Sequence, residues 1–295
     1  MRRILNALML MLVMISCQQN RKKPTDILNK YLTTDQSKIS YSIAGQGEIT
    51  LLFVHGWNIN KSYWSFQQDR FDDDYQVIAM DLPGFGESVN LSGEYSIASY
   101  ANDIKVLINQ LDLKQVVLIG HSMGGRIILE AAQQNDKVIA LIGVDNFKEV
   151  GQILTEDLRA EADGFVDWLK SDFASNSSMY VDNYLIHQDT DSLIRSRIVH
   201  DYKMANPESA IAAIDSYLSY DHSEVDRLSS LQIPIFLISS SMSPVDTNGL
   251  QNTGLKFSVF EMDKTGHFPM VEQPAVFNEF LNKALEEINS DKEKS

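Results

Sequence analysis

The sequence predicts an α/β fold built on a mostly parallel sheet with helices on both faces. Continuous apolar segments rich in β-branched residues, such as 115–120 and 138–144, alternate with segments of helical periodicity. Strands that are apolar on both faces are typical of parallel sheets, because helices cover both sides of the sheet. The chain has 295 residues and is 44% hydrophobic, so it can build the buried core that this architecture needs.

Residues 1–16 are predicted to be a signal peptide. Arg2 and Arg3 precede an apolar run that is too short to span a bilayer comfortably. The run ends at Cys17, the only cysteine, and the stretch MISC resembles the lipobox of bacterial lipoproteins, whose cysteine carries a lipid. We therefore expect export from the cytoplasm and a membrane anchor at Cys17, on the periplasmic face or the cell surface. A plain secretory signal, in which Cys17 is incidental, is the alternative.

Residues 17–37 are polar and are expected to form a tether between the anchor and the fold. The net charge of −15 repels phosphate backbones, which argues against nucleic acid as a partner. Because the chain has only one cysteine, its stability must come from a buried core and not from disulfides.

Strands and helices alternate in order through the first part of the core, residues 38–146. Strands are expected in 49–56, 75–82, 115–120 and 138–144. Helices are expected in 61–71 and 126–135, and also in 97–111, where apolar residues recur on one helical face. Strand-like segments return at 233–240 and 255–262, and a helix at 274–288 closes the second part of the core, residues 228–290.

Residues 147–227 interrupt this alternation. They read as several helices that mix aromatic and acidic residues, and Pro207 is suited to the first turn of one of them. Because this segment lies between two predicted strands, we expect a helical cap inserted into one domain and not a second domain.

Four short motifs occur in a characteristic order. They are His55-Gly56 after a strand, DLPGFGES at 81–88, the G-x-S-x-G pattern within 120–125, and GHFPMVEQP at 266–274. Together they resemble the α/β-hydrolase superfamily over almost all of the chain after the tether. The resemblance implies a mostly parallel twisted sheet of about eight strands, with 147–227 as its cap.

The resemblance also implies roles for particular residues. Ser122 would be the nucleophile and His267 the base that takes its proton, since the superfamily places histidine last in the chain. The backbone N–H groups of Trp57 and Met123 would form the oxyanion hole.

The acid of the triad departs from the superfamily pattern. The position before Pro244, where an acid is usual, is Ser243. Asp246 follows closely, but it also fits the start of a helix without any catalytic role. Asp145 ends an apolar strand, where some superfamily members carry the acid. We favour Asp145 and keep Asp246 as the alternative.

These residues predict a serine hydrolase that cleaves a small-molecule carboxylic ester, in the manner of a carboxylesterase or lipase, through an acyl-enzyme. Amidase, peptidase, C–C hydrolase and perhydrolase chemistry use the same constellation. The alternative from another class is a non-catalytic surface lipoprotein that binds a small molecule. No cofactor is expected, and the scattered histidines lack the spacing of a metal site. The sequence indicates no particular substrate or oligomeric state.

Overall fold

One nine-stranded sheet forms the centre of the protein. The computed structural model describes residues 27–220 and 224–292. The strand order is β1-β2-β4-β3-β6-β7-β8-β9, with β5 paired to β2. The strands are β1 (Leu28–Thr33), β2 (Ser37–Ala44), β3 (Ile49–Val54), β4 (Gln76–Met80), β5 (Val89–Asn90), β6 (Gln115–His121), β7 (Val138–Val144), β8 (Ile235–Ser240) and β9 (Phe257–Met262). Strands β3, β4 and β6 to β9 pair in parallel. The mostly parallel sheet is confirmed, with one strand more than the eight expected.

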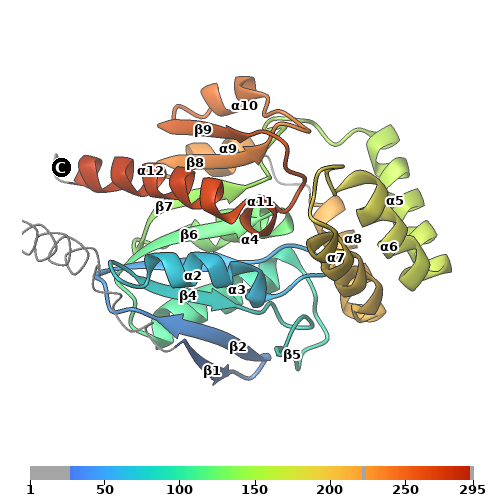
Figure 1. Cartoon of the computed structure of the whole chain (residues 1–295), viewed down its shortest axis with the longest axis horizontal. Coiled ribbons are helices and arrows are strands. Elements are labelled where there is room, and N and C mark those ends of the chain that lie inside the picture. Colours follow the sequence, from blue (N-terminus) through green and yellow to red (C-terminus); the bar gives the residue numbers. More distant parts are fainter. Residues whose placement is uncertain (1–26, 221–223, 293–295) are drawn as a thin grey trace, which may run out of the picture.

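Helices cover both faces of this sheet (Figure 1). Helices α2 and α12 contact each other, as do α3 and α4. The sheet residues between them, such as Leu51 to Val54 and Val116 to Ile119, are fully buried. The helices of the core are η1 (Lys61–Trp64), α2 (Ser65–Phe71), α3 (Ile97–Gln110), α4 (Met123–Ala132), α10 (Thr247–Gln251), α11 (Pro269–Glu272) and α12 (Pro274–Lys292).

Between β7 and β8, in the segment expected to form a cap, the described residues form five helices. They are α5 (Glu156–Ser171), α6 (Phe173–Tyr184), α7 (Ser192–Met204), α8 (Pro207–Leu218) and α9 (Glu224–Ser229). Figure 1 shows α5 to α8 gathered at one end of the sheet, whereas α9 contacts α4 of the core. Across the described residues, none of the helices has the length and apolar character needed to cross a bilayer.

The first described strand differs from the expectation for residues 17–37. Leu28 to Thr33 form β1, which pairs antiparallel with β2, so this part is not a tether. The strand was missed because it lies at the edge of the sheet and buries only Leu32, which leaves no apolar alternation to read. Cys17 and the predicted signal peptide lie outside the described residues.

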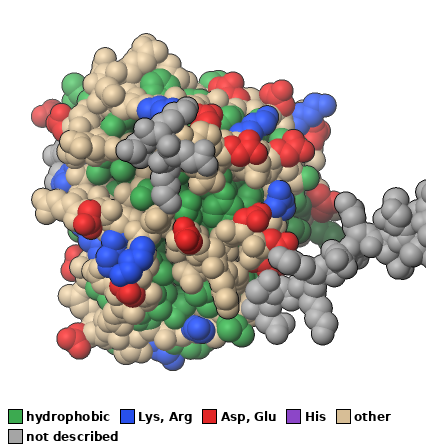
Figure 2. Space-filling view, turned by 90° about the vertical axis from the view of Figure 1, so that its left-hand side faces the viewer, with side chains coloured by type: hydrophobic (Ala, Val, Ile, Leu, Met, Phe, Trp, Pro, Cys, Tyr) green, Lys and Arg blue, Asp and Glu red, His purple; other side chains and the backbone are tan. Residues whose placement is uncertain are grey.

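The two ends of the parallel strands have different surroundings. The carboxyl ends of these strands meet where helices α5 to α8 lie. The chain enters at the opposite, amino end, because Leu28 pairs with Ile43, and the adjacent Ala44 pairs with Val77 near the start of β4. Figure 2 shows the side of the molecule opposite α5 to α8, where charged side chains of both signs are interspersed with apolar ones.

Candidate active site

Ser122 lies on a sharp turn between β6 and α4. Its φ of 53° and ψ of −120° form a conformation that a residue other than glycine rarely adopts. The turn is tight enough that a Cβ at Gly120 would lie 2.4 Å from the carbonyl oxygen of Gly124. This explains why the G-x-S-x-G pattern requires glycine here, and it places Ser122 on the wall of a cavity.

His267 lies on the same cavity, in the loop that follows β9. Its Nδ1 lies 2.5 Å from Oδ2 of Asp145. A carboxylate can only accept, so Nδ1 carries the hydrogen and Nε2 is the ring atom free to take up a proton. Within the described residues, no hydrogen bond joins the hydroxyl of Ser122 to His267. Such bonds are often long in unliganded enzymes and tighten when substrate binds.

Asp145 follows β7 directly and is 5% exposed. Its second oxygen, Oδ1, accepts hydrogen bonds from the backbone N–H of Ser240 at 2.8 Å and from Nζ of Lys148 at 2.8 Å. Burial acts to raise the pKa of Asp145, but the hydrogen bond and charge of His267 and the charge of Lys148 outweigh it, so the pKa is lowered. The carboxylate therefore stays ionised at neutral pH.

Asp246 lies elsewhere. It is exposed and caps α10, where its Oδ1 accepts from the backbone N–H of Asn248 at 2.9 Å. It does not belong to the wall of the cavity. Of the two aspartates kept open by the sequence, the structure brings Asp145 to His267 and leaves Asp246 in the capping position.

The loop after β3 runs directly against the turn that carries Ser122. A Cβ at Gly56 would lie 2.6 Å from Nδ1 of His121 and 2.9 Å from Cβ of Ser122, so only glycine fits. Trp57 is buried, and its indole N–H donates to the carbonyl oxygen of Ala210 in α8 at 2.7 Å. Trp57 and Met123, the two residues expected to supply the oxyanion hole, both line the cavity with Ser122.

His55 links the loop after β3 to the DLPGFGES motif. Its Nε2 accepts from the backbone N–H of Leu82 at 2.9 Å, so its Nδ1 carries the hydrogen and donates to the carbonyl oxygen of Gly56 at 2.7 Å. Burial is the main cause that lowers the pKa of His55, with Asp81 opposing it. A neutral histidine therefore holds the backbone on both sides of the loop.

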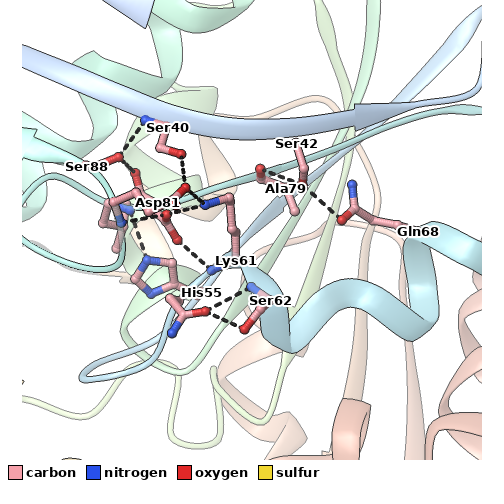
Figure 3. A network of polar contacts seen from close by, with 12 residues as sticks. Ser40, Ser42, His55, Lys61, Ser62, Gln68, Ala79, Asp81 and Ser88 are labelled. Carbon is pink, nitrogen blue, oxygen red and sulfur yellow. Dashed lines mark hydrogen bonds and ion pairs between the residues drawn. The ribbon is translucent and has the colours of Figure 1, made fainter. Parts of the chain in front are cut away.

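Asp81 anchors the same region through a buried ion pair (Figure 3). Its carboxylate accepts from the backbone N–H and from Nζ of Lys61, both at 2.7 Å, and from the backbone N–H of Glu87 at 3.0 Å. Asp81 is fully buried, so these donors replace the water that it loses. The motif thus fixes the loop that carries Gly56.

Three residues near the triad were missed by sequence reasoning. His121 lies 2.7 Å through Nε2 from the backbone carbonyl oxygen of His267, and the two rings lie 4.7 Å apart. Burial, and then the charge of His267, lower the pKa of His121 well below its usual value, so it stays neutral and donates to that carbonyl.

Asn146, the second of these residues, donates to the carbonyl oxygen of Gly120 at 2.7 Å. Lys148, which bonds Asp145, is the third. The only available signal was their position within three residues of Ser122 or Asp145 in the sequence.

The cavity has a volume of about 820 Å³ and lies between the carboxyl ends of the strands and the inserted helices. Its wall contains the candidate triad together with residues of α5 to α8, many of them aromatic. Over residues 27–220 and 224–292, no cluster of His, Cys, Asp and Glu has the arrangement of a metal site. The chemistry available here is that of a serine, a histidine and a buried carboxylate.

Comparison with known proteins gives relatives of similar architecture. The chain is 22% identical over 266 residues to 3-oxoadipate enol-lactonase 2 of Acinetobacter baylyi, which covers 88% of this chain and 97% of the relative. An esterase structure from Thermogutta terrifontis matches with a TM-score of 0.76 and 21% identity, over 88% of this chain and 99% of that one. An esterase from Exiguobacterium antarcticum matches with a TM-score of 0.75 and 21% identity, over 88% and 100%.

More similar sequences match over shorter regions. An uncharacterised protein of Mycobacterium tuberculosis is 33% identical over 110 residues, which is 37% of this chain and 32% of that protein. The alignment thus spans about a third of that relative's length. The sequence profile described as the alpha/beta hydrolase fold matches residues 49–274, which includes every candidate catalytic residue. The chain therefore belongs to the alpha/beta hydrolase fold family.

Proposed function

We propose that this protein is a serine hydrolase that cleaves carboxylic esters through an acyl-enzyme on Ser122. The observation that carries the proposal is the meeting of three groups at one cavity. Ser122 lies on a strained turn, His267 faces the same space, and the buried carboxylate of Asp145 lies 2.5 Å from His267. Serine needs an adjacent base to act as a nucleophile, and the base needs a partner that orients it.

In the proposed reaction, the hydroxyl of Ser122 attacks the ester carbonyl and passes its proton to Nε2 of His267. The Asp145 carboxylate holds the ring with Nδ1 protonated and stabilises the imidazolium that forms. The backbone N–H groups of Trp57 and Met123 stabilise the negative oxygen of the tetrahedral intermediate. His267 then gives the proton to the departing alcohol, and a water molecule activated by the same histidine releases the acid.

Asp145 is proposed as the acid in preference to Asp246. Support comes from its contact with His267 and from the pKa of Asp145, which is lowered so that the negative charge is kept. The ester as the bond cleaved is supported by the similar proteins, two of them esterases and one an enol-lactonase.

We also infer that the protein is exported and anchored through a lipid on Cys17. The support is the sequence alone, namely Arg2, Arg3, the short apolar run and the lone cysteine after it. Metabolic labelling with a fatty-acid analogue tests the inference. Label should enter the wild type and be absent from Cys17→Ala, and equal labelling of both would refute the anchor.

A fluorophosphonate probe tests the proposed activity, because it reacts with a serine only when the base and the oxyanion donors are assembled. Wild type and Ser122→Ala would be labelled in parallel, and their hydrolysis of p-nitrophenyl acetate compared. We expect labelling and turnover in the wild type and neither in Ser122→Ala. Folded wild type that takes no label and shows no turnover above Ser122→Ala would overturn the proposal and favour a binding protein.

A further inference from the structure

The wall of the cavity carries more acidic than basic side chains among the described residues. Among the described residues of the wall, the two lysine and arginine side chains are both paired, Arg126 with Glu224 at 2.8 Å and Lys148 with the catalytic candidate Asp145. Two further carboxylates of the wall, Glu149 and Glu161, are exposed and make no ion pair within the described residues. The cavity therefore has excess negative charge, which disfavours anionic ligands.

Five tyrosines of the described residues line the same cavity, and three of them are buried or partly buried residues of α6, α7 and α8. Tyr180, Tyr202 and Tyr217 come from three different helices, α6, α7 and α8. In the part of the chain that the structure describes, no protein group hydrogen-bonds any of these hydroxyls. Tyr180 and Tyr217 are partly exposed residues. Tyr202 is the most buried of the three tyrosines, since the residue as a whole is 2% exposed.

The rings of two of these tyrosines, Tyr180 and Tyr202, lie close to residues of the proposed reaction centre. The ring of Tyr202 lies 5.4 Å from the ring of Trp57 and 6.1 Å from that of Phe268, which directly follows His267. The ring of Tyr180 lies 6.4 Å from that of Trp57. A substrate held by its ester group at Ser122 therefore places its adjoining part among the tyrosines.

The three hydroxyls stay protonated at neutral pH. Burial is the main cause that raises the pKa of Tyr180, Tyr202 and Tyr217. Each is therefore a neutral group that can donate one hydrogen bond and accept others. Aromatic rings around them, including Phe165 and Trp57, supply apolar surface to the same space. The wall thus combines neutral hydrogen-bonding groups, ring surfaces and a negative field.

A substrate that displaces water from these hydroxyls must replace its hydrogen bonds, because an unpaired buried polar group is destabilising. An alkyl group cannot do this, and a carboxylate is opposed by the negative field. We propose that the cavity selects esters in which the part next to the ester bond is uncharged and bears several hydroxyl groups, as in an acylated sugar or polyol. This inference rests on the proposed ester hydrolysis at Ser122.

Three matched substrates test the selection. Cyclohexyl acetate keeps a six-membered ring and the acetate ester but lacks the hydroxyls and the ring oxygen of 3-O-acetylglucose, and 3-O-acetylglucuronate carries a carboxylate in place of the hydroxymethyl group. The measured quantity is the ratio of kcat/KM between substrates. We expect 3-O-acetylglucose to be favoured over each of the other two by about tenfold or more, because a site built to hydrogen-bond hydroxyls strongly rejects analogues without them. Equal or higher kcat/KM for cyclohexyl acetate would overturn the inference.

Removing the tyrosine hydroxyls one at a time tests whether they cause the substrate preference. Tyr180→Phe, Tyr202→Phe and Tyr217→Phe should each lower the ratio of 3-O-acetylglucose to cyclohexyl acetate by roughly 2- to 12-fold, the worth of one hydrogen bond. Tyr31→Phe removes a hydroxyl from strand β1, outside the cavity, and should leave the ratio unchanged. Ratios that stay constant in all three cavity variants would show that the tyrosines do not select the substrate.

A binding measurement separates this inference from the proposed activity. Ser122→Ala cannot form the acyl-enzyme, so its binding of intact 3-O-acetylglucose is followed by tryptophan fluorescence, with Trp57 close to Tyr202. Binding that weakens when Tyr202→Phe is added supports the inference even if the wild type hydrolyses no ester, in which case only the proposed activity fails. Turnover of p-nitrophenyl acetate without binding or preference for the sugar ester overturns the inference alone.

Discussion

Replacing Asp145 by asparagine should invert the hydrogen bonding of His267. Oδ1 of Asp145 faces two donors, the backbone N–H of Ser240 and the ammonium of Lys148, each at 2.8 Å. In Asp145→Asn the amide oxygen has to stay there, so the NH₂ group is turned toward Nδ1 of His267. That nitrogen must then accept, which moves the ring hydrogen to Nε2 and removes the acceptor that Ser122 needs.

The wrong tautomer of a catalytic histidine lowers kcat by about 10⁴. At about 1.36 kcal/mol for each factor of ten, this is about 5.4 kcal/mol of lost transition-state stabilisation. The assay is kcat for p-nitrophenyl acetate, with fluorophosphonate labelling alongside and a thermal melt to show that the variant folds.

Asp246→Asn is the matched control. Asparagine caps a helix about as well as aspartate, so this variant should keep its activity within about twofold and its stability within a few tenths of a kcal/mol. The reasoning fails if folded Asp145→Asn keeps more than about a tenth of the wild-type kcat, or if Asp246→Asn is the variant that loses activity.

Three further predictions concern the elements that support the site. Gly56→Ala should lower kcat by about 10²-fold, because the new Cβ would lie 2.9 Å from Cβ of Ser122 and displace the loop; ester turnover measures this, and an unchanged kcat would contradict it. Burial lowers the pKa of His55, so the unfolded chain binds a proton more readily than the folded one. The contribution of His55 to stability is then fully present above about pH 6.5 and falls below it by up to about 1.4 kcal/mol per pH unit, which urea unfolding of wild type between pH 7.5 and 5.5 would detect and a flat profile would refute. Lys61→Met should destabilise the fold by about 3 kcal/mol, because it leaves the carboxylate of Asp81 buried without its ammonium partner. Urea unfolding measures the loss, and adding Asp81→Asn should recover part of it.

Much of the fold could be predicted because its signals are local. The strands β3, β6 and β7 are apolar on both faces, so their sequences read as continuous runs whatever the rest of the chain does. The turn at Ser122 is equally local, because the glycines around it are required by contacts within a few residues. The edge strand β1 could not be predicted in this way, since its pairing depends on β2 and it buries a single residue.

Identifying the acid and the supporting side chains requires contacts between residues that are far apart in the sequence. Asp145 and His267 are 122 residues apart in the sequence. Asp145 follows β7 and Asp246 follows β8, and the carboxyl ends of these two parallel strands lie side by side. Only the path of each loop decides which carboxylate reaches the histidine. His121 and Lys148 were passed over for the same reason, because a histidine or lysine next to a motif has no sequence pattern that reveals its partner.

The place where the chain enters the sheet has a consequence for how the protein would sit on a membrane. Leu28 lies at the amino end of the parallel strands, opposite α5 to α8, and only residues 18–27 separate Cys17 from Leu28. Ten residues reach at most about 35 Å when fully extended. If Cys17 carries a lipid, the attachment lies at the end of the molecule away from helices α5 to α8, whose residues line the cavity. Substrates would then reach the cavity from the surrounding water and not by lateral diffusion in the bilayer.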